Sequence, residues 1–426
     1  MNHKVLTAIG TALAIGSIAS AQTADDLVKQ GRDFLAATNM FAANLSFSNA
    51  VVKSPNHPVA NVLHAASQLL AWPDQPIGSN FLTALQFPAA GRNIYKWTSQ
   101  VPSDSRGLPL VSETLNARDI TDILRTNLAP GFIAAEACLA KVTDINFQLV
   151  LSARETRTVE VTLDFGDLQI LRAMLKAAEC LSYNFYSWNL DARLAAIRTL
   201  YTNEQLSLER LLMDYPHLLQ YSSTNDLVSA KSAFQAGVAR YLEGSQRIRA
   251  RGAKVVNYLF NFDPSDASGE EKFRQTLIDL NSSLAGAVPL AVADSYRVCL
   301  APFFSGRNPV RAWLPAVRGN NFVLGSLPDP TFGGLVEGLD PDQIEDTLAQ
   351  YLGTIPSIQP LVRLPDQKLR VSLNVQRGNG YMVQSTTNLL QWTDLTAFIA
   401  PSNHISFEIS EGLNLPRLFY RLSERK

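Results

Sequence analysis

The stretch Val159–Phe165, which reads VEVTLDF, alternates apolar and polar residues without a break. This period of two residues is typical of a β-strand with one buried face. A less regular run covers 147–151, and a polar joint at 153–158 separates the two runs, so we expect a β-hairpin. After the hairpin the apolar residues recur every three or four positions, which indicates helices. The central stretch 147–251 is therefore predicted to be the body of the protein, either an α+β unit or a helical bundle with a hairpin.

Four helices are expected after this hairpin. Asp167 is predicted to cap the first, which has an apolar face (Leu168, Leu171, Leu175, Ala178, Leu181) and an opposite charged side (Arg172, Lys176, Glu179). The second begins near Asn203 and ends before Pro216, the third covers Asp226–Arg251, and the fourth covers Glu270–Ala287. The third helix closes with basic residues that suit the negative end of its dipole, and a binding patch is the alternative. These are Arg247, Arg249, Arg251 and Lys254.

The N-terminal stretch 23–71 is predicted to form a helical hairpin followed by a third helix. Small residues, aromatic residues and a proline recur there at fixed spacing: Gly31, Phe34, Ala43, Phe47, Ala50 and Pro55. On these residues, 24–57 resembles one tetratricopeptide repeat, in which small residues let two antiparallel helices approach. Leu27 and Gln30 depart from the pattern of that family, and coincidental spacing on an ordinary helical hairpin is the alternative. Because about three repeats are needed for a solenoid, we interpret this part as a repeat-like helical cap.

The segments on either side of the central stretch are less regular. Residues 73–112 read as a long irregular connection with a short strand near Ile94–Thr98. Helices are then expected at Ser112–Asn127 and Pro130–Val142. After Pro289 we expect short strands and turns, with one strand in Tyr296–Phe304, a helix at Asp340–Tyr351 and a linker at 353–365.

The last 60 or so residues change character, since apolar and polar residues alternate again from Leu369 to Val375. A Gly-Asn-Gly turn at 378–380 leads into a second strand at 381–385, and further strands are expected at 405–409 and 418–422. This part is predicted to be an all-β module of five to seven strands, arranged as a sandwich.

Two further resemblances concern the β module and the central region. Tyr381–Leu389, Trp392 and Phe419–Arg421 are similar to a short C-terminal β module of many exported proteins of environmental bacteria. Leu163–Asp167, Leu171–Ala173 and Asp329–Gly334 are similar to segments of helical exported bacterial proteins of unknown function. These resemblances imply attachment, sorting or binding at the cell surface, and they carry no activity to any residue.

The predicted fold class is mainly α with a C-terminal all-β, sandwich-like module. The helical part has a tetratricopeptide-like start and a central helical bundle with a β-hairpin. The predicted domains are a signal peptide (1–21), an N-terminal helical region (22–145), a central helical domain with short strands (146–352), a linker (353–365) and the β module (366–426).

Residues 1–21 have the pattern of a secretory signal peptide. Lys4 supplies the positive start, Val5–Ile18 the apolar stretch, and Ala19-Ser20-Ala21 the small residues before a cleavage site. A buried or anchoring N-terminal helix is the alternative. No other segment has 18 uninterrupted apolar residues, so no transmembrane span is expected in the mature chain. We expect an exported protein in the periplasm, on the outer surface or secreted.

Charge and cysteine content exclude further classes. The formal net charge is −1, so the chain does not have the excess of basic residues that is typical of a dedicated nucleic-acid binder. The cysteines Cys138, Cys180 and Cys299 allow at most one disulfide, so a disulfide-stapled scaffold is excluded. All three lie in apolar segments and are interpreted as buried small hydrophobes.

No catalytic, cofactor-binding or metal-binding residue is predicted. The sequence has no Gly-x-Ser-x-Gly elbow, phosphate loop or dinucleotide glycine pattern. His57 and His64 are explained as helix residues. Acidic residues around Gly269 (Asp263, Asp266, Glu270, Glu271) depart from an EF-hand and are read as a helix-capping turn. Aromatic residues gather at one helix end (Tyr183, Phe185, Tyr186, Trp188), where packing is the default and a sugar-stacking platform the alternative.

The leading hypothesis is an exported, non-enzymatic binding or scaffolding protein at the cell envelope or outside the cell. Its helical region would bind a protein partner, and the β module would attach it to a surface. The alternative is a helical carbohydrate-active enzyme with a β accessory module. That alternative requires a cleft in the central unit with aromatic residues and two converging carboxylates. A third possibility is an assembly subunit that pairs through edge strands of the β module.

Overall fold

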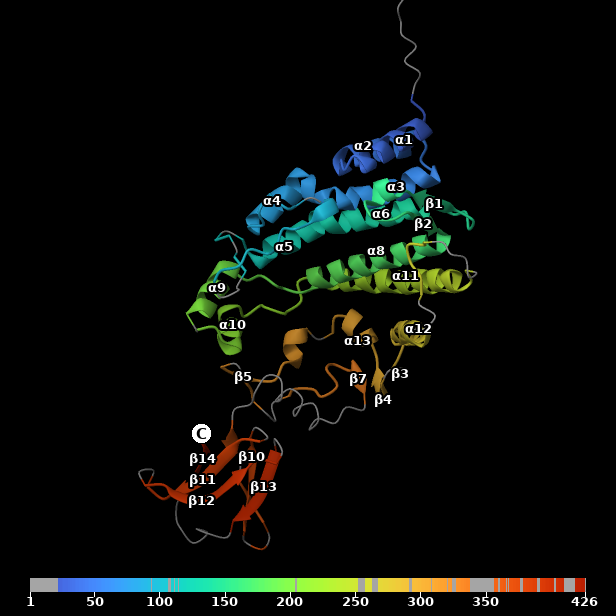
Figure 1. The fold of residues 1–426 in the computed structure, drawn as a ribbon. Helices are drawn as coiled ribbons and strands as arrows, with labels where there is room; N and C mark the ends of the chain where they lie inside the picture. The colour runs from blue at the N-terminus through green and yellow to red at the C-terminus, as the bar shows by residue number, and fades with distance from the viewer. Residues whose placement is uncertain are drawn as a thin grey trace, which may run out of the picture. The chain divides into compact units, whose positions relative to one another are not determined.

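The computed structural model describes most of the chain. The described residues are 22–92, 94–105, 109–110, 112–113, 115–203, 205–251, 257–262, 267–290, 293–307, 309–319, 321–323, 327–337, 356–358, 361–364, 366, 368–375, 378–388, 391–401, 404–409 and 418–425. The predicted signal peptide and the predicted helix Asp340–Tyr351 lie outside these residues. The chain is mainly helical with a β region at its C-terminal end, as predicted (Figure 1).

The chain divides into two compact units. Unit 1 contains Met1–Leu110, Pro130–Leu175 and Arg240–Asn261, and unit 2 contains Val111–Ala129, Lys176–Ala239 and Phe262–Lys426. Each unit therefore gathers stretches that are distant in the sequence. The predicted domain boundaries at residues 145, 352 and 365 stay predictions.

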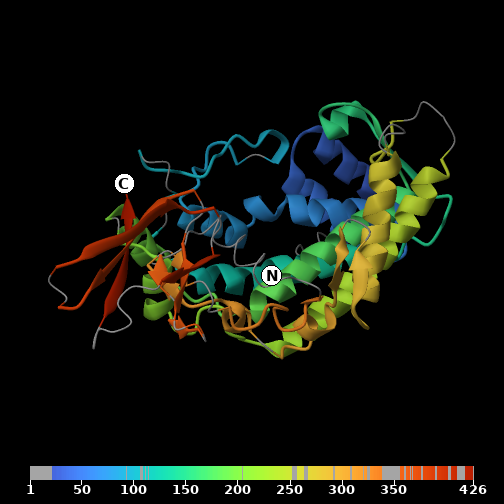
Figure 2. The same ribbon diagram turned by 90° about the horizontal axis from the view of Figure 1, so that it is seen from below.

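Unit 1 begins with three helices, α1 (Ala24–Ala36), α2 (Met40–Lys53) and α3 (Pro58–Leu70), which lie side by side in Figures 1 and 2. The Thr23 hydroxyl accepts a hydrogen bond from the Asp26 amide at 3.1 Å and starts α1 with a capping box. Gly31 is a point of close approach, because a Cβ there would lie 2.3 Å from Cε1 of Phe47. Phe47 is fully buried, so the predicted hairpin is confirmed.

The segment after α3 is more helical than predicted. It contains η1 (Trp72–Asp74), α4 (Pro76–Ala84) and η2 (Ile94–Lys96). The predicted strand at Ile94–Thr98 is wrong, because the backbone there folds onto Gly91. The amides of Thr98 and Ser99 both donate to the Gly91 carbonyl, at 2.9 and 3.0 Å. Gly91 has a φ of +86°, which favours glycine and closes the turn.

The predicted hairpin is confirmed. Strand β1 (Gln148–Leu151) pairs antiparallel with β2 (Val161–Asp164), with Leu149 opposite Leu163. Both leucines are buried in the core of unit 1, which also contains Phe47, Leu63 and Leu139. The short helix α7 (Ala153–Thr156) lies between the strands. The hairpin has a further partner that the sequence did not predict, since the Thr162 amide donates to the Asn257 carbonyl at 2.8 Å.

Helix α8 (Phe165–Ser187) begins earlier than predicted. Asp164 is its cap: its carboxylate accepts from the Asp167 amide at 3.0 Å, and the Asp167 carboxylate accepts from the Asp164 amide at 3.0 Å. The prediction that Asp167 caps the helix is therefore wrong by one turn.

The predicted faces of α8 are also partly wrong. Leu181 is 61% exposed, whereas Arg172 and Glu179 are only 8% exposed. Both buried charges have partners within their own unit. Arg172 Nε donates to Glu136 at 2.8 Å, and Lys176 Nζ donates to Glu179 at 2.7 Å. Pairing with an opposite charge offsets the desolvation cost of these positions, and the apolar pattern of the sequence does not reveal such partners.

A cluster of charged side chains joins the start of α8 to the segment that follows α11 (Thr224–Arg249), within unit 1. The Arg251 Nε donates to Asp164 at 2.8 Å, and its terminal nitrogen lies 2.9 Å from Asp167. Asp167 is completely buried. The guanidinium also stacks 4.1 Å from the centre of the Tyr258 ring. Arg251 thus crosslinks the start of α8 to the segment after α11, whereas it was predicted to close the helix among residues that suit its dipole.

The two carboxyl groups of this cluster respond to burial differently. For Asp164, burial alone favours the protonated form, but hydrogen bonds from Arg251 and from backbone amides outweigh it, so its pKa is lowered. For Asp167, desolvation by burial dominates and raises the pKa in spite of Arg251. The ionised form of Asp167 therefore depends more than that of Asp164 on the Arg251 guanidinium.

A second buried carboxylate, Glu155, holds α7 against α1. It accepts from Arg32 Nε at 2.6 Å and from the Ser152 hydroxyl at 2.6 Å. Burial opposes the ionised form, but the hydrogen bonds from Arg32 and Ser152 prevail and lower the pKa of Glu155 below its ordinary 4.5.

Replacing Glu155 by Gln is expected to flatten the acid side of the stability profile. A depressed pKa in the folded state stabilises the protein above the unfolded value of 4.5, and this contribution is lost as the pH falls through the folded value. We expect Glu155→Gln to cost about 1.5–3 kcal/mol at neutral pH, where charged hydrogen bonds are lost. The cost should shrink in urea titrations below pH 4.5. A cost independent of pH would contradict this assignment, and Glu160→Gln, at an exposed position of the same hairpin, is the control.

The helical part of unit 2 contains more helices than predicted. Its elements are α5 (Ala117–Ile123), a π-helical turn η3 (Leu124–Leu128), α9 (Leu194–Thr202), α10 (Leu208–Asp214), α12 (Ala267–Ser282), α13 (Ala301–Phe304) and η5 (Val310–Trp313). The chain continues from η3 into α6 (Ala129–Ala140). The predicted helix from Asn203 is α10 and begins at Leu208, and α9 was missed. A core of Cys180, Ala230, Ala233, Leu284 and Phe304 holds this part together.

Short strands complete the helical part of unit 2. Strands β3 (Val288–Leu290), β4 (Ala293–Val298) and β7 (Val336–Glu337) form one sheet in the order β3-β4-β7, and β5 (Val317–Arg318) pairs with β6 (Asn321–Phe322). The predicted strand within Tyr296–Phe304 is thus β4, which ends at Val298, and α13 follows it.

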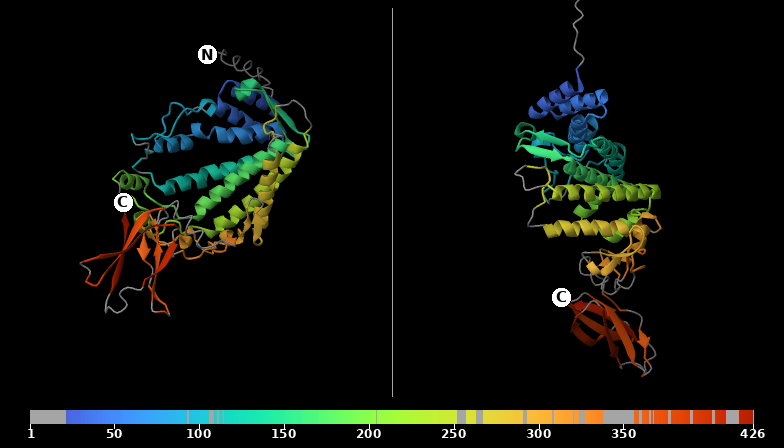
Figure 3. Two further views of the ribbon diagram at one scale, coloured as in Figure 1. Left: turned by 60° about the horizontal axis from the view of Figure 1, so that its bottom comes forward. Right: turned by 90° about the vertical axis from the view of Figure 1, so that its right-hand side faces the viewer.

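The β module forms two antiparallel sheets, drawn in red in Figure 3. One has the order β13-β10-β8, with β9 also paired to β10, and the other has the order β12-β11-β14. The strands are β8 (Ser357–Ile358), β9 (Val362–Arg363), β10 (Leu369–Asn374), β11 (Gly380–Thr386), β12 (Thr393–Ile399), β13 (His404–Ile409) and β14 (Phe419–Arg425). Val371, Leu373, Tyr381 and Val383 are fully buried between them, so the alternation read from the sequence is confirmed.

The cysteines are free thiols. Cys180 is buried, and this burial raises the pKa of its thiol to about 11. Among the described residues, no helix is both long enough and apolar enough to cross a membrane.

Candidate binding pocket

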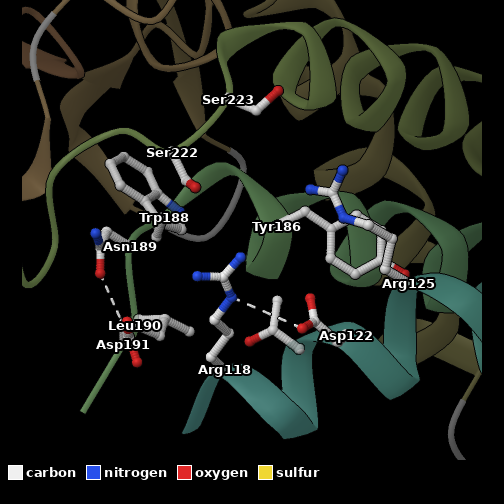
Figure 4. Close-up of a pocket in the computed structure, with 11 residues that line it drawn as sticks. Arg118, Asp122, Arg125, Tyr186, Trp188, Asn189, Leu190, Asp191, Ser222 and Ser223 are labelled. Carbon is white, nitrogen blue, oxygen red and sulfur yellow. Dashed lines mark hydrogen bonds and ion pairs between the residues drawn. The ribbon is translucent and has the colours of Figure 1, made fainter.

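A polar cavity of about 390 Å³ lies within unit 2 (Figure 4). Its size is in the range of small-molecule sites. One wall is formed by α5 and the η3 turn that continues it, and the other consists of the end of α8, the loop that follows it and the residues before α11. The side chains that line the cavity include Arg118, Asp122, Arg125, Tyr186, Trp188, Asn189, Asp191, Ser222 and Ser223.

The first wall presents charged side chains from successive turns of α5 and η3. Asn116 and Asp119 form a capping box that fixes the start of the helix, and the Asn116 amide donates to Asp119 at 2.8 Å. Residues four and seven positions after Arg118 lie on the same helical face. Arg118, Asp122 and Arg125 therefore point to one side, as Figure 4 shows.

Arg125 is held in place by two contacts. Its guanidinium carbon lies 4.5 Å from the centre of the Tyr186 ring, and its terminal nitrogen donates to Asp226 at 2.8 Å. Tyr186 is only 2% exposed, and burial raises its pKa to about 12. The phenol therefore stays neutral at physiological pH, and Arg125 is oriented before any ligand arrives.

Backbone hydrogen bonds fix the opposite wall. The Asn189 amide donates to the Gln220 carbonyl at 2.8 Å, and the Ser222 amide donates to the Ser187 carbonyl at 2.8 Å. The Ala117 amide donates to the Ala192 carbonyl at 3.0 Å, which ties this wall to the start of α5. Main-chain contacts therefore hold the opposite wall in place and fix it against the start of α5.

The Trp188 ring packs against two other aromatic rings. The Tyr221 ring stacks 4.7 Å from it at 25°, and the Phe303 ring centre lies at 5.9 Å. Tyr186 packs edge-on against Tyr183 at 5.9 Å and carries Arg125 on its ring. The predicted aromatic group thus supplies two pocket residues, Tyr186 and Trp188, but the contacts of their rings are those of packing.

The charges of the pocket are mixed. Arg118 and Asp122 approach to 3.7 Å but are 72% and 58% exposed, so their pairing is weak and both remain open to a ligand. Asp191 is exposed on the opposite wall, and its amide donates to the Asn189 side chain at 3.0 Å. Guanidinium groups, carboxylates, hydroxyl groups and an amide in one lining suit a polar ligand that carries both donors and acceptors.

The carboxylates do not match the usual setting of a glycosidase acid. That acid is a carboxyl group in an apolar pocket, whereas Asp122 is largely exposed and faces a guanidinium. The described residues contain no group of three or more His, Cys, Asp or Glu side chains that could hold a metal ion.

The two histidines that the sequence singled out have structural contacts. His57 Nδ1 accepts from the Ala60 amide at 3.2 Å and caps α3, and its Nε2 lies 2.9 Å from Asp25. His64 Nδ1 lies 3.2 Å from the Asn44 side chain, and burial lowers its pKa.

Sequence reasoning predicted the helix that carries Arg118 and Arg125 but did not name them as site residues. The available signal was two arginines seven positions apart on one face. Asn189, Ser222 and Ser223 carry no comparable signal, because they join the pocket through contacts between distant loops. Asp263, Asp266 and Lys254 lie outside the described residues.

Comparisons of the chain with protein families, with curated proteins and with solved structures find no match.

Proposed function

We propose that the protein is an exported, non-enzymatic binding protein that acts at the cell envelope or outside the cell, and that the pocket beside α5 receives a polar segment of a protein partner. The signal-peptide pattern at residues 1–21 supports export. The observation that carries the binding role is the pre-formed pocket, in which Arg125 is oriented by Tyr186 and Asp226. A site that is ordered before binding loses less entropy when it takes its ligand.

The mixed lining supports a polar protein segment as the ligand. Arg118 and Arg125 suit carboxylates, Asp122 and Asp191 suit ammonium or guanidinium groups, and Asn189 suits a backbone amide.

The N-terminal helices support partner binding independently. A stripe on α2 exposes Phe41 (55%), Leu45 (55%) and Val52 (77%), at positions that share one face of the helix. The close packing of Gly31 against Phe47 fits the proposed tetratricopeptide-like hairpin. Surface attachment through the β module completes this proposal.

Photo-crosslinking from position 189 tests the pocket. A crosslinking residue replaces Asn189 in the full chain, and the envelope fraction is analysed with Arg118 intact or replaced by Glu. If Arg118 anchors the partner, its loss should reduce a crosslinked species by about tenfold or more, as for an interface hot spot. Arg154→Glu, at an exposed position of α7, should leave it unchanged. No crosslinked species, or equal yields in both variants, would refute the proposal.

The carbohydrate-active enzyme is the second candidate, since Trp188 and two carboxylates do line one pocket. It predicts hydrolysis of an envelope polysaccharide that Asp122→Asn and Asp191→Asn both abolish. Hydrolysis with this dependence would replace the binding role by the enzymatic one.

A further inference from the structure

A second cavity of about 390 Å³ lies within unit 1 and has a different character from the first. The end of α1, the start of α2, α3, the η2 turn and the hairpin enclose it. Apolar side chains form most of its lining, among them Leu35, Met40, Leu63, Ile94 and Leu151. An apolar cavity of this size favours an apolar ligand over water.

Two polar side chains of this cavity, Ser67 and Glu155, are already hydrogen-bonded. The Ser67 hydroxyl donates to the Asn44 side chain at 3.1 Å. The Glu155 carboxylate accepts from Arg32 and Ser152, with distances of 2.6 to 3.0 Å. A peptide entering here would leave its own backbone amides unpaired, which is costly. An alkyl chain has no such groups.

One charge of the lining differs from the others. Arg157 is exposed and has no ion-pair partner among the residues that the structure describes. Its backbone is left-handed, with a φ of +64° and ψ of 8°, directly after α7. The Tyr95 phenol also lines the cavity, and burial raises its pKa. Because Arg32 already neutralises Glu155, Arg157 gives this cavity a net positive charge.

We propose that this cavity binds a straight-chain amphiphile, with its alkyl tail among Leu35, Leu63 and Leu151 and its anionic head group at Arg157. The apolar lining supplies the binding energy of the tail, and the uncompensated guanidinium selects the charge of the head. This site is separate from the polar pocket of unit 2 and does not depend on the function proposed for it.

Calorimetric titration of the full chain with alkanoates from hexanoate to dodecanoate, below their micelle concentrations, tests the proposal. Affinity should rise about fourfold per added methylene until the cavity is full, the equivalent of about 0.8 kcal/mol. Decanoate should bind at least about tenfold more tightly than decanol or decyltrimethylammonium, because a charge-assisted hydrogen bond is lost in those probes.

Two variants test where the head group and the alkyl tail of the ligand bind. Arg157→Gln should weaken decanoate about tenfold or more and leave decanol unchanged, and the matched control is Arg154→Gln, at an exposed position in α7 outside the lining. Ala66→Trp, which projects into the cavity from an exposed position on α3, should abolish binding of all the probes. Its control is Ala137→Trp, at an exposed position on α6 outside the lining.

The proposal fails if no alkanoate binds, if affinity does not depend on chain length, or if Arg157→Gln binds decanoate as tightly as the wild type. A circular dichroism spectrum and melting temperature equal to those of the wild type establish that each variant is folded. Equal affinity for decanoate and decyltrimethylammonium would also overturn it, because Arg157 would then not select the head group.

Discussion

Replacing Arg251 by Met is expected to lower the free energy of unfolding by about 3–5 kcal/mol, as measured by urea denaturation at neutral pH. Met keeps much of the volume but removes the charge that pairs with Asp164 and Asp167. Asp167 is fully buried, and its pKa is already raised by burial. Without the guanidinium, an uncompensated carboxylate remains in the interior.

The pH dependence of this variant has a definite sign. Loss of Arg251 raises the pKa of Asp167 further and removes a group that lowers the pKa of Asp164, so the folded variant takes up protons more readily than the folded wild type. The destabilisation should therefore be smaller in mildly acidic buffer than at neutral pH. Replacing both aspartates by Asn in the same variant should recover part of the loss, because neutral amides are less costly to bury. Equal destabilisation at both pH values would contradict the assignment, and Arg154→Met is the control for loss of an exposed arginine.

Phe47→Ala is expected to cost about 3–5 kcal/mol in the same measurement. Phe47 is completely buried and fills the space that the absence of a Cβ at Gly31 leaves open. Gly31→Ala alone should cost about 1–3 kcal/mol, because the new Cβ would overlap the Phe47 ring.

The two substitutions should not be additive. Once Phe47 is Ala, the Cβ at position 31 no longer meets the ring and partly fills the cavity, so the double variant should be more stable than the sum of the single effects predicts. Additivity within experimental error would mean that these residues do not share one packing site. Phe41→Ala, at an exposed position on α2, is expected to have a small effect.

The fold was predictable where one face of an element is apolar and regular. The alternation of Val159–Phe165 predicted β2, and the alternation from Leu369 predicted β10. Prediction failed where tertiary contacts override the local pattern. Asp164 rather than Asp167 caps α8, because two aspartates three residues apart form a reciprocal pair. The buried position of Arg172 depends on Glu136, which is distant in the sequence.

The candidate pocket was less predictable than the fold. Arg118 and Arg125 could be placed on one face of a helix from the sequence. Their partners could not, because Tyr186 and Asp226 come from elements more than 50 residues away. The pocket residues carry both signs of charge and belong to no catalytic motif, so the sequence has no charge cluster or motif that would indicate a site.

The chain passes between its two units several times, and this limits how the protein can be cut into separate fragments. Unit 1 consists of three separate stretches, and the unit boundaries at Leu175 and Ala239 fall inside the continuous helices α8 and α11. No single protease cut can release a complete unit 1, and neither unit can be transferred to another protein by one gene fusion.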